Sequence, residues 1–188
     1  MPENSILRPT LWRTCRVLAN FTRLKIFAAL LHEPNQTVSA VAAQLHQPLS
    51  LVSEYLRALE ARGLLTVRRE GPRVKYRISP SGNGSGSSGL VSALRSICQT
   101  EPEPPKVIFN LVTGFTHPRR IEIFRVLQPG PRNLGQLRMA TRISTWALLR
   151  HLRKLSARGF VTHKQGMYVA VQHTHALGRE LARLAGQE

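Results

Sequence analysis

Aspartate is absent from this chain of 188 residues, and all ten acidic residues are glutamates. They stand against 27 lysines and arginines, which leaves a formal net charge of +17. Because no paired carboxylates and no nucleophile beside a base are visible, we do not expect an enzyme. The positive charge instead favours a polyanionic partner, since each phosphate that a protein neutralises releases condensed counterions.

Cysteines and long apolar runs are also scarce. Cys15 and Cys98 stand in helical apolar patterns without a CxxC partner, so we expect both to be reduced and to serve packing. No apolar run approaches the ~18 residues of a membrane span, and residues 1–10 lack the apolar core of a signal peptide. We therefore expect a cytoplasmic protein that binds no membrane. His173 and His175 have no obvious third ligand, so we expect neither a metal nor a cofactor.

The chain resembles itself at an offset of 96 or 97 residues. Residues 20–27 align with residues 117–124, and residues 56–64 align with residues 152–160. Each half is therefore expected to form one unit of about 70 to 80 residues. We assign residues 1–78 to a first domain, 79–89 to a Gly/Ser-rich linker, 90–104 to a connecting helix with a Pro-rich segment, and 105–188 to a diverged second domain.

The linker contains a GxGxxG pattern at residues 84–89. A dinucleotide site would require a βαβ unit with an acidic residue ~20 positions further on. Glu101 and Glu103 lie nearer than that, in a Pro-rich stretch without an evident second strand. The composition is typical of a flexible connection, and we favour that interpretation.

Apolar periodicity gives both halves the same order of elements. In the first half it predicts helices at 11–19, 23–31, 39–45 and 49–62, then strands at 65–69 and 74–78. In the second half it predicts helices at 106–114, 119–127, 134–140 and 145–159, then a shorter hairpin within 161–171. One further helix closes each half, at 90–98 and 174–184, and Thr22 and Thr37 are the expected N-caps. The order predicts a mainly α fold with small β-hairpin wings, as two tandem winged helix-turn-helix domains.

The first half resembles the ArsR-type family of bacterial winged-helix repressors. The resemblance rests on residues 18–26, 50–64 and 68–76, and it covers roughly residues 11–78. It implies binding to operators as dimers that are joined through their first and last helices. Members often sense a metal through a thiolate pair in the short third helix, but residues 37–44 contain no cysteine. Metal sensing of that kind is therefore not supported.

The winged-helix prediction singles out DNA-contacting residues, because the N-terminal part of a recognition helix enters the major groove. In the first unit these are Leu49, Ser50, Ser53, Glu54 and Arg57. Wing residues expected at phosphates or in the minor groove are Arg68, Arg69, Arg73 and Lys75. The second unit contributes Thr145, Arg150, Arg153 and Lys164. Trp146 and Leu149 are poor base readers at such positions, and we favour core or interface packing for Trp146.

Together these observations predict a transcriptional regulator that binds double-stranded DNA, most simply as a repressor. Its two units would form a pseudo-dimer within one chain, and a homodimer of the tandem chain stays open as an alternative. A plasmid replication initiator or an architectural, chromosome-organising module is the competing function, since both use tandem winged helices. The operator and any small-molecule effector are not specified by the sequence.

Overall fold

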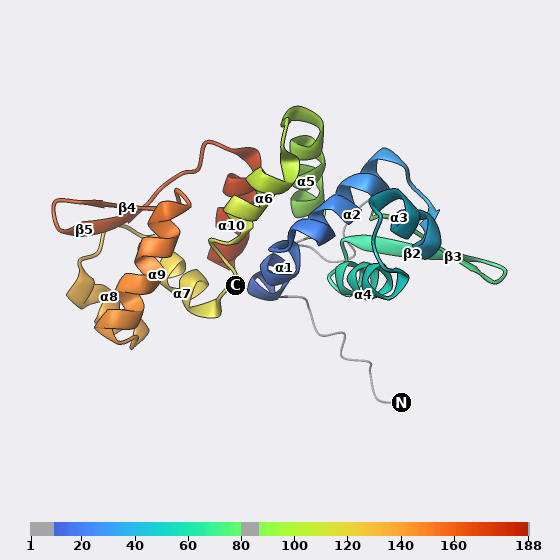
Figure 1. Cartoon of the computed structure of the whole chain (residues 1–188). Helices are drawn as coiled ribbons and strands as arrows, with labels where there is room; N and C mark the ends of the chain where they lie inside the picture. Colours follow the sequence, from blue (N-terminus) through green and yellow to red (C-terminus); the bar gives the residue numbers. More distant parts are fainter. Residues whose placement is uncertain (1–9, 80–86, 188) are drawn as a thin grey trace.

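The computed structural model describes residues 10–79 and 87–187 (Figure 1). The first unit consists of α1 (Leu11–Leu18), α2 (Phe21–His32), β1 (Gln36–Thr37), α3 (Val38–Leu45), α4 (Leu49–Glu60), β2 (Leu65–Glu70), β3 (Arg73–Ile78) and α5 (Ser87–Thr100). The second unit consists of α6 (Pro104–Val112), α7 (Pro118–Leu127), α8 (Leu134–Thr141), α9 (Thr145–Ala157), β4 (Val161–Lys164), β5 (Met167–Ala170) and α10 (Ala176–Gln187). The prediction of a mainly α chain with small hairpins is confirmed, and the order of elements is compatible with winged helices.

Local sequence signals explain where α2 and α3 begin. The Thr37 hydroxyl accepts a hydrogen bond from the Ala40 amide and caps α3, as expected. The expected cap at Thr22 is wrong, because the Asn20 side chain accepts from the Arg23 amide and α2 begins at Phe21. Asparagine is the better N-cap of the two, and its position also lengthens the helix by two residues over the expected start.

The turn between the short and the long helix of each unit has the same backbone. His46 ends α3 with φ 50°, and Arg142 ends α8 with φ 53°. Both residues adopt the left-handed conformation that ends a helix and reverses the chain within few residues. In both units the short helix therefore leads into the long helix through one left-handed residue.

The β-structure is slightly larger than expected. The two residues of β1 pair with β3, so the first sheet has the order β1-β3-β2. Strands β4 and β5 form the second sheet, and an isolated bridge joins Arg132 to Tyr168 beside it. A two-residue strand is too short to show alternation, and for that reason periodicity did not reveal β1. The two hairpins extend toward opposite ends of the molecule (Figure 1).

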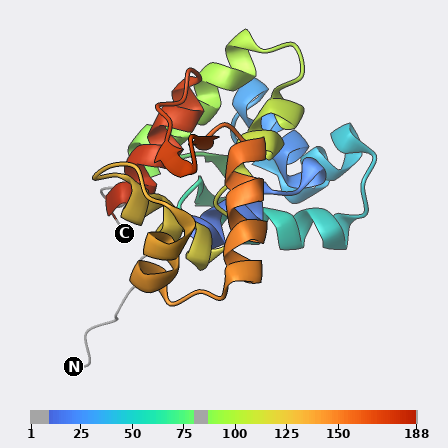
Figure 2. The same ribbon diagram turned by 90° about the vertical axis from the view of Figure 1, so that its left-hand side faces the viewer.

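The centre of the molecule is a seam of helices from both units. Helix α1 packs against α6, and α5 packs against α10, so first helix meets first helix and last helix meets last. Their buried side chains belong to one continuous core: Leu11, Cys15, Leu18, Leu90, Leu94, Ile97, Ile108, Leu111, Val112, Leu177, Leu181 and Ala185. Seen from the side, the second unit stands in front of the first, with α9 upright in front of the blue helices (Figure 2).

An aromatic contact adds to this seam. Phe21 at the start of α2 stacks on Phe109 of α6, with the ring centroids 4.5 Å apart.

The segment expected as a linker is shorter than 79–89, because Ser79 is buried with its amide bonded to the Leu64 carbonyl and α5 begins at Ser87. Residues 80–86 of that segment lie outside the described residues. No helix in the described ranges has the length and apolarity needed to cross a membrane.

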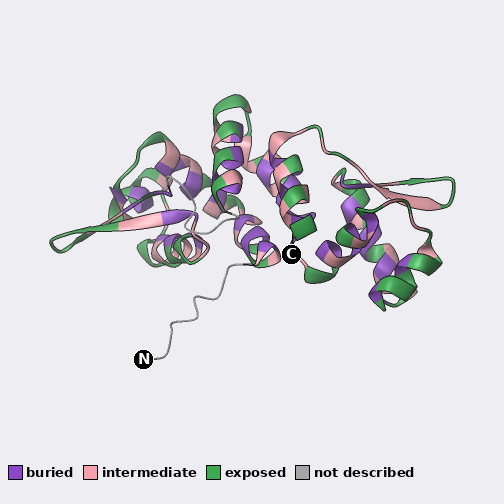
Figure 3. Ribbon diagram, turned by 180° about the vertical axis from the view of Figure 1, so that it is seen from behind, coloured by how far each residue is buried: buried purple, intermediate pink, exposed green. Residues whose placement is uncertain are grey.

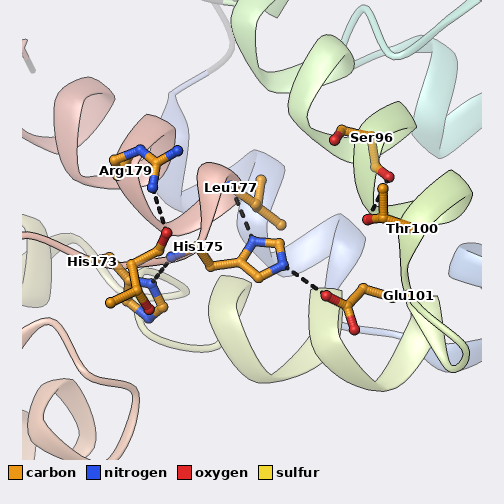
Figure 4. A network of polar contacts seen from close by, with 8 residues as sticks. Ser96, Thr100, Glu101, His173, His175, Leu177 and Arg179 are labelled. Carbon is orange, nitrogen blue, oxygen red and sulfur yellow. Dashed lines mark hydrogen bonds and ion pairs between the residues drawn. The ribbon is translucent and has the colours of Figure 1, made fainter.

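A polar contact ties the end of α5 to the start of α10 (Figure 4). His175 Nε2 lies 3.3 Å from Glu101 Oε1, and its Nδ1 accepts a hydrogen bond from the Leu177 amide. His173 in turn accepts from the His175 amide and packs beside the Phe160 ring, with the centroids 5.2 Å apart. The two histidines therefore order the entry into α10.

Corresponding positions of the two units hold an arginine beside a ring. In the first unit the Arg23 guanidinium lies 4.5 Å from the centre of the Tyr55 ring. In the second unit Arg120 and His151 occupy these positions, and His117 packs on His151 with centroids 4.7 Å apart. Burial, with His117 and Arg120 close by, lowers the pKa of His151 from 6.5 to about 4.

The titration of His151 predicts an acid-sensitive fold. The unfolded chain takes up a proton near pH 6.5, whereas the folded chain resists it until about pH 4. The stability linked to neutral His151 is therefore complete above pH 6.5 and is lost as the pH falls toward 4. His151→Tyr places here the residue that the first unit has, Tyr55. We expect the free energy of unfolding of this variant to fall less between pH 7 and 4.5 than that of the wild type. Denaturant titrations at both pH values measure this, and equal losses in variant and wild type would contradict it.

Candidate nucleic-acid interface

The exposed face of α4 carries the residues predicted to read bases. Val52, Leu56 and Leu59 point into the core, and this orientation turns the opposite face of the helix to solvent. Leu49, Ser50, Glu54 and Arg57 are exposed there, and Ser53 is half-buried. The five predicted residues are thus brought together on the accessible side of one helix. No side-chain cap covers the amides at its start, since Pro48 holds the N-cap position.

Two of these residues contact each other. The Arg57 guanidinium donates from Nη2 to Ser53 Oγ over 3.0 Å and from Nε to the Ser53 carbonyl over 3.3 Å. The spacing of four residues places the two side chains one turn apart on the helix. The contact presents a hydroxyl and a guanidinium as one unit, and such a pair of donors suits a base edge or a phosphate.

The register of the first hairpin divides the wing cations between its two faces. Arg68 pairs with Lys75, and Glu70 pairs with Arg73, so these side chains share one face. Arg69 pairs with Val74 and lies on the other face, together with Val67 and Tyr76. The sequence alone treated Arg68, Arg69, Arg73 and Lys75 as one group, whereas the structure separates Arg69 from the other three. The far end of the hairpin is exposed (Figure 3).

A carboxylate stands among the wing cations. Glu70 Oε2 lies 2.6 Å from Lys75 Nζ, and Glu70 Oε1 lies 3.3 Å from Arg68 Nε. The hydrogen bond from Lys75 and the charges of Lys75 and Arg68 lower the pKa of Glu70 below its usual range. Glu70 therefore stays ionised at neutral pH and offsets part of the positive charge that the wing presents.

The second unit repeats the exposed helix face with different chemistry. Leu148, Leu152 and Leu155 of α9 are buried, while Arg150 and Arg153 are exposed and Thr145 is half-buried. Of the two alternatives favoured for Trp146, packing in the core of this chain is wrong, because the side chain is 86% exposed, and packing at an interface stays a prediction. Periodicity could have placed it outward, because it lies one and two turns before Arg150 and Arg153. The size and apolarity of the indole had favoured a position in the interior.

Sequence reasoning missed two cations that surround this helix. Arg138 lies on α8 and Arg142 ends that helix, and both are exposed. The signal was available, since the chain has ten lysines and arginines and no acidic residue between Glu122 and Glu180. Within the described residues, no hydrogen bond or ion pair holds the side chains of Arg138, Arg142, Arg150 or Arg153.

The second hairpin offers a smaller contact surface. Gln165 and Gly166 both have positive φ and close a two-residue turn, after which Met167 pairs with Lys164. Lys164 is exposed at the end of β4, as the prediction of a DNA contact there requires. His163 stacks on Tyr168 beside it, with centroids 4.3 Å apart. One cation at the tip contrasts with the several cations of the first hairpin.

Metal binding finds no support in the described part of the chain. No group of three or more His, Cys or Glu side chains within it could hold a metal ion. Cys15 is buried, and burial raises the pKa of the partly buried Cys98 thiol, which disfavours the thiolate that metals require.

A family model matches part of the chain. Residues 22–81 match the model of the family described as sugar-specific transcriptional regulator TrmB. The search of the curated proteins and the search of the solved structures produced no match. The matched segment runs from α2 through β3 and so contains α4 and the first hairpin, whereas the second unit lies outside it. Over these residues the first unit is therefore similar to a winged-helix DNA-binding family of transcriptional regulators.

Proposed function

We propose that the protein is a transcriptional regulator that binds double-stranded DNA through α4 and the β2–β3 hairpin. The observation that carries the proposal is the exposed face of α4, where Ser50, Ser53 and Arg57 lie together beside a cationic hairpin. A helix of this kind reads base edges in the major groove, and wing cations bind the flanking phosphates. The net charge of +17 supports a nucleic-acid partner.

The proposal includes a pseudo-dimer within one chain. Pairing of α1 with α6 and of α5 with α10 joins like elements, as an isologous dimer interface does. That pairing, and the order of elements that recurs along the chain, also support a tandem duplication. Because α4 and α9 carry different side chains, the preferred DNA site would be asymmetric. A homodimer with four units would instead require a symmetric, longer site.

Repression is the mode of action that the ArsR-type resemblance favours. A protein on a promoter site excludes polymerase simply by occupying it, so repression needs no further surface on the chain. No effector is assigned, and a promoter–reporter assay with and without the protein would separate repression from activation.

An architectural module is the second candidate, and one observation favours it. The second helix-turn-helix has four unpaired arginines and a tryptophan where base-reading side chains are expected. Binding that rests on phosphate contacts alone is uniform across sequences and strongly salt-dependent. Selection from a random duplex pool distinguishes the two, because a regulator enriches one motif and an architectural module enriches none.

Removal of the Ser53–Arg57 pair tests the recognition helix. We expect Ser53→Ala with Arg57→Ala to weaken binding to the selected site by at least about five-fold, since a bidentate base contact contributes roughly 1–3 kcal/mol. Lys106→Ala, which removes an exposed cation from α6, is the control and should change affinity little. Equal affinities of both variants by fluorescence anisotropy would show that α4 does not read the site.

The carboxylate of the wing provides a second test. Glu70→Gln should strengthen DNA binding several-fold at low salt, because Arg68 and Lys75 then lose a competing anion. The slope of log affinity against log salt should also steepen, by roughly one for each additional phosphate contact. Glu103→Gln removes one negative charge at the N-cap of α6 and is the matched control. If both substitutions act alike, the wing does not contact phosphate and only net charge matters.

A further inference from the structure

Trp146 is the most exposed large apolar side chain in the described residues and has no role in the fold. It is 86% exposed at the start of α9, and Met139 of α8 is 80% exposed. We propose that the second helix-turn-helix deforms duplex DNA, with Trp146 inserted between base pairs as an aromatic wedge. The inference rests on the proposed DNA binding and adds to it an activity of the second unit.

The position of Trp146 on its helix supports this role. At about 100° per residue, Trp146, Arg150 and Arg153 fall on one face of α9, opposite the buried Leu148, Leu152 and Leu155. The corresponding face of α4 carries Ser50, Glu54 and Arg57 at an offset of 96. The indole thus occupies the place of a base-reading serine, at the end of the helix that enters a groove.

Charge decides what can cover this apolar surface. Arg138, Arg142, Arg150 and Arg153 are exposed on α8 and α9, and no acidic residue occurs between Glu122 and Glu180. A second copy of the same surface would place these arginines against one another, which opposes self-association through it. A DNA backbone supplies the complementary charge, so the same arginines that repel a copy attract a duplex.

The start of α9 adds donors for a phosphate. Ser144 holds the N-cap position, but its side chain makes no cap hydrogen bond. The backbone amides of the first turn of α9 are therefore not capped by that side chain. Helix N-termini bind phosphate through such amides. A phosphate held here lies within reach of the base step that Trp146 would enter.

An indole has little capacity to discriminate bases, but it stacks on any of them. Apolar side chains inserted at a base step unstack it and kink the duplex by roughly 20–90°. The site preference of such a wedge follows how easily a step unstacks, and pyrimidine–purine steps unstack most easily. The two units would then divide the work: α4 selects the sequence, and α9 bends the flanking DNA.

The chain allows a direct spectroscopic test, because Trp12 and Trp146 are its only tryptophans. In the Trp12→Phe variant all tryptophan emission comes from Trp146. Titration with a duplex selected for binding should quench this emission, since an excited indole stacked on a base loses its energy by electron transfer to that base. Dyes at the two duplex ends should move closer at the same protein concentrations, and 2-aminopurine at the entered step should brighten.

Variants at the two helices separate the wedge from the reader. Trp146→Ser, which places the first unit's residue here, should abolish bending and weaken binding roughly ten-fold, the loss expected for one base–aromatic stack. Trp146→Phe should keep most of both, whereas Ser53→Ala with Arg57→Ala should lose sequence preference and keep the bend. Unquenched Trp146 on bound DNA, or full bending by Trp146→Ser, would overturn the inference while leaving the proposed function intact.

Two further outcomes have distinct meanings. A shift of Trp146 emission with protein concentration in the absence of DNA would assign this surface to self-association and refute the wedge. Absence of any duplex binding by the wild type would refute the proposed function, and the inference with it.

Discussion

Burial of apolar side chains between α1, α5, α6 and α10 holds the two units together, and the placement of both exposed helices depends on it. Each fully buried leucine contributes roughly 1.5–3 kcal/mol, and the seam contains several of them from each unit. Two further contacts join the units: the Phe21 ring stacks on Phe109, and His175 contacts Glu101. A single covalent chain therefore fixes a geometry that separate subunits reach only at sufficient concentration.

On this common scaffold the two units present unlike surfaces. The inward stripes of α4 and α9 are both leucine-rich, so packing keeps both helices in the same orientation within their units. Their outward faces are free of that constraint and differ in chemistry, with a serine–arginine pair on one and an indole among arginines on the other. Glu70 offsets part of the positive charge of the first hairpin, whereas α8 and α9 contain no carboxylate side chain.

Helix order, hairpins and the solvent-facing side of α4 could be predicted from the sequence because each depends on local periodicity and capping, and DNA contact by that side stays a prediction. The family match over residues 22–81 agrees with that part, and the ArsR type stays a prediction. Long-range features could not be predicted in the same way. The pairing of Glu70 with Lys75 depends on strand register, and the pairing of like helices depends on how separate apolar stripes meet. Apolarity alone does not separate a core position from an interface position for Trp146, whereas its helical position turns it to solvent.

We propose that one chain applies α4 and α9 to one duplex at the same time. Gln44 of α3 and Ala140 of α8 are exposed and occupy corresponding positions of the two units. In a chain whose Cys15 and Cys98 are replaced by serine, Gln44→Cys or Ala140→Cys provides one thiol for a tethered DNA-cleaving probe. We expect both probes to cut the same selected duplex, each at its own fixed position on either side of the site's centre. Cleavage from Gln44 alone, with none or only uniform cleavage from Ala140, would contradict it.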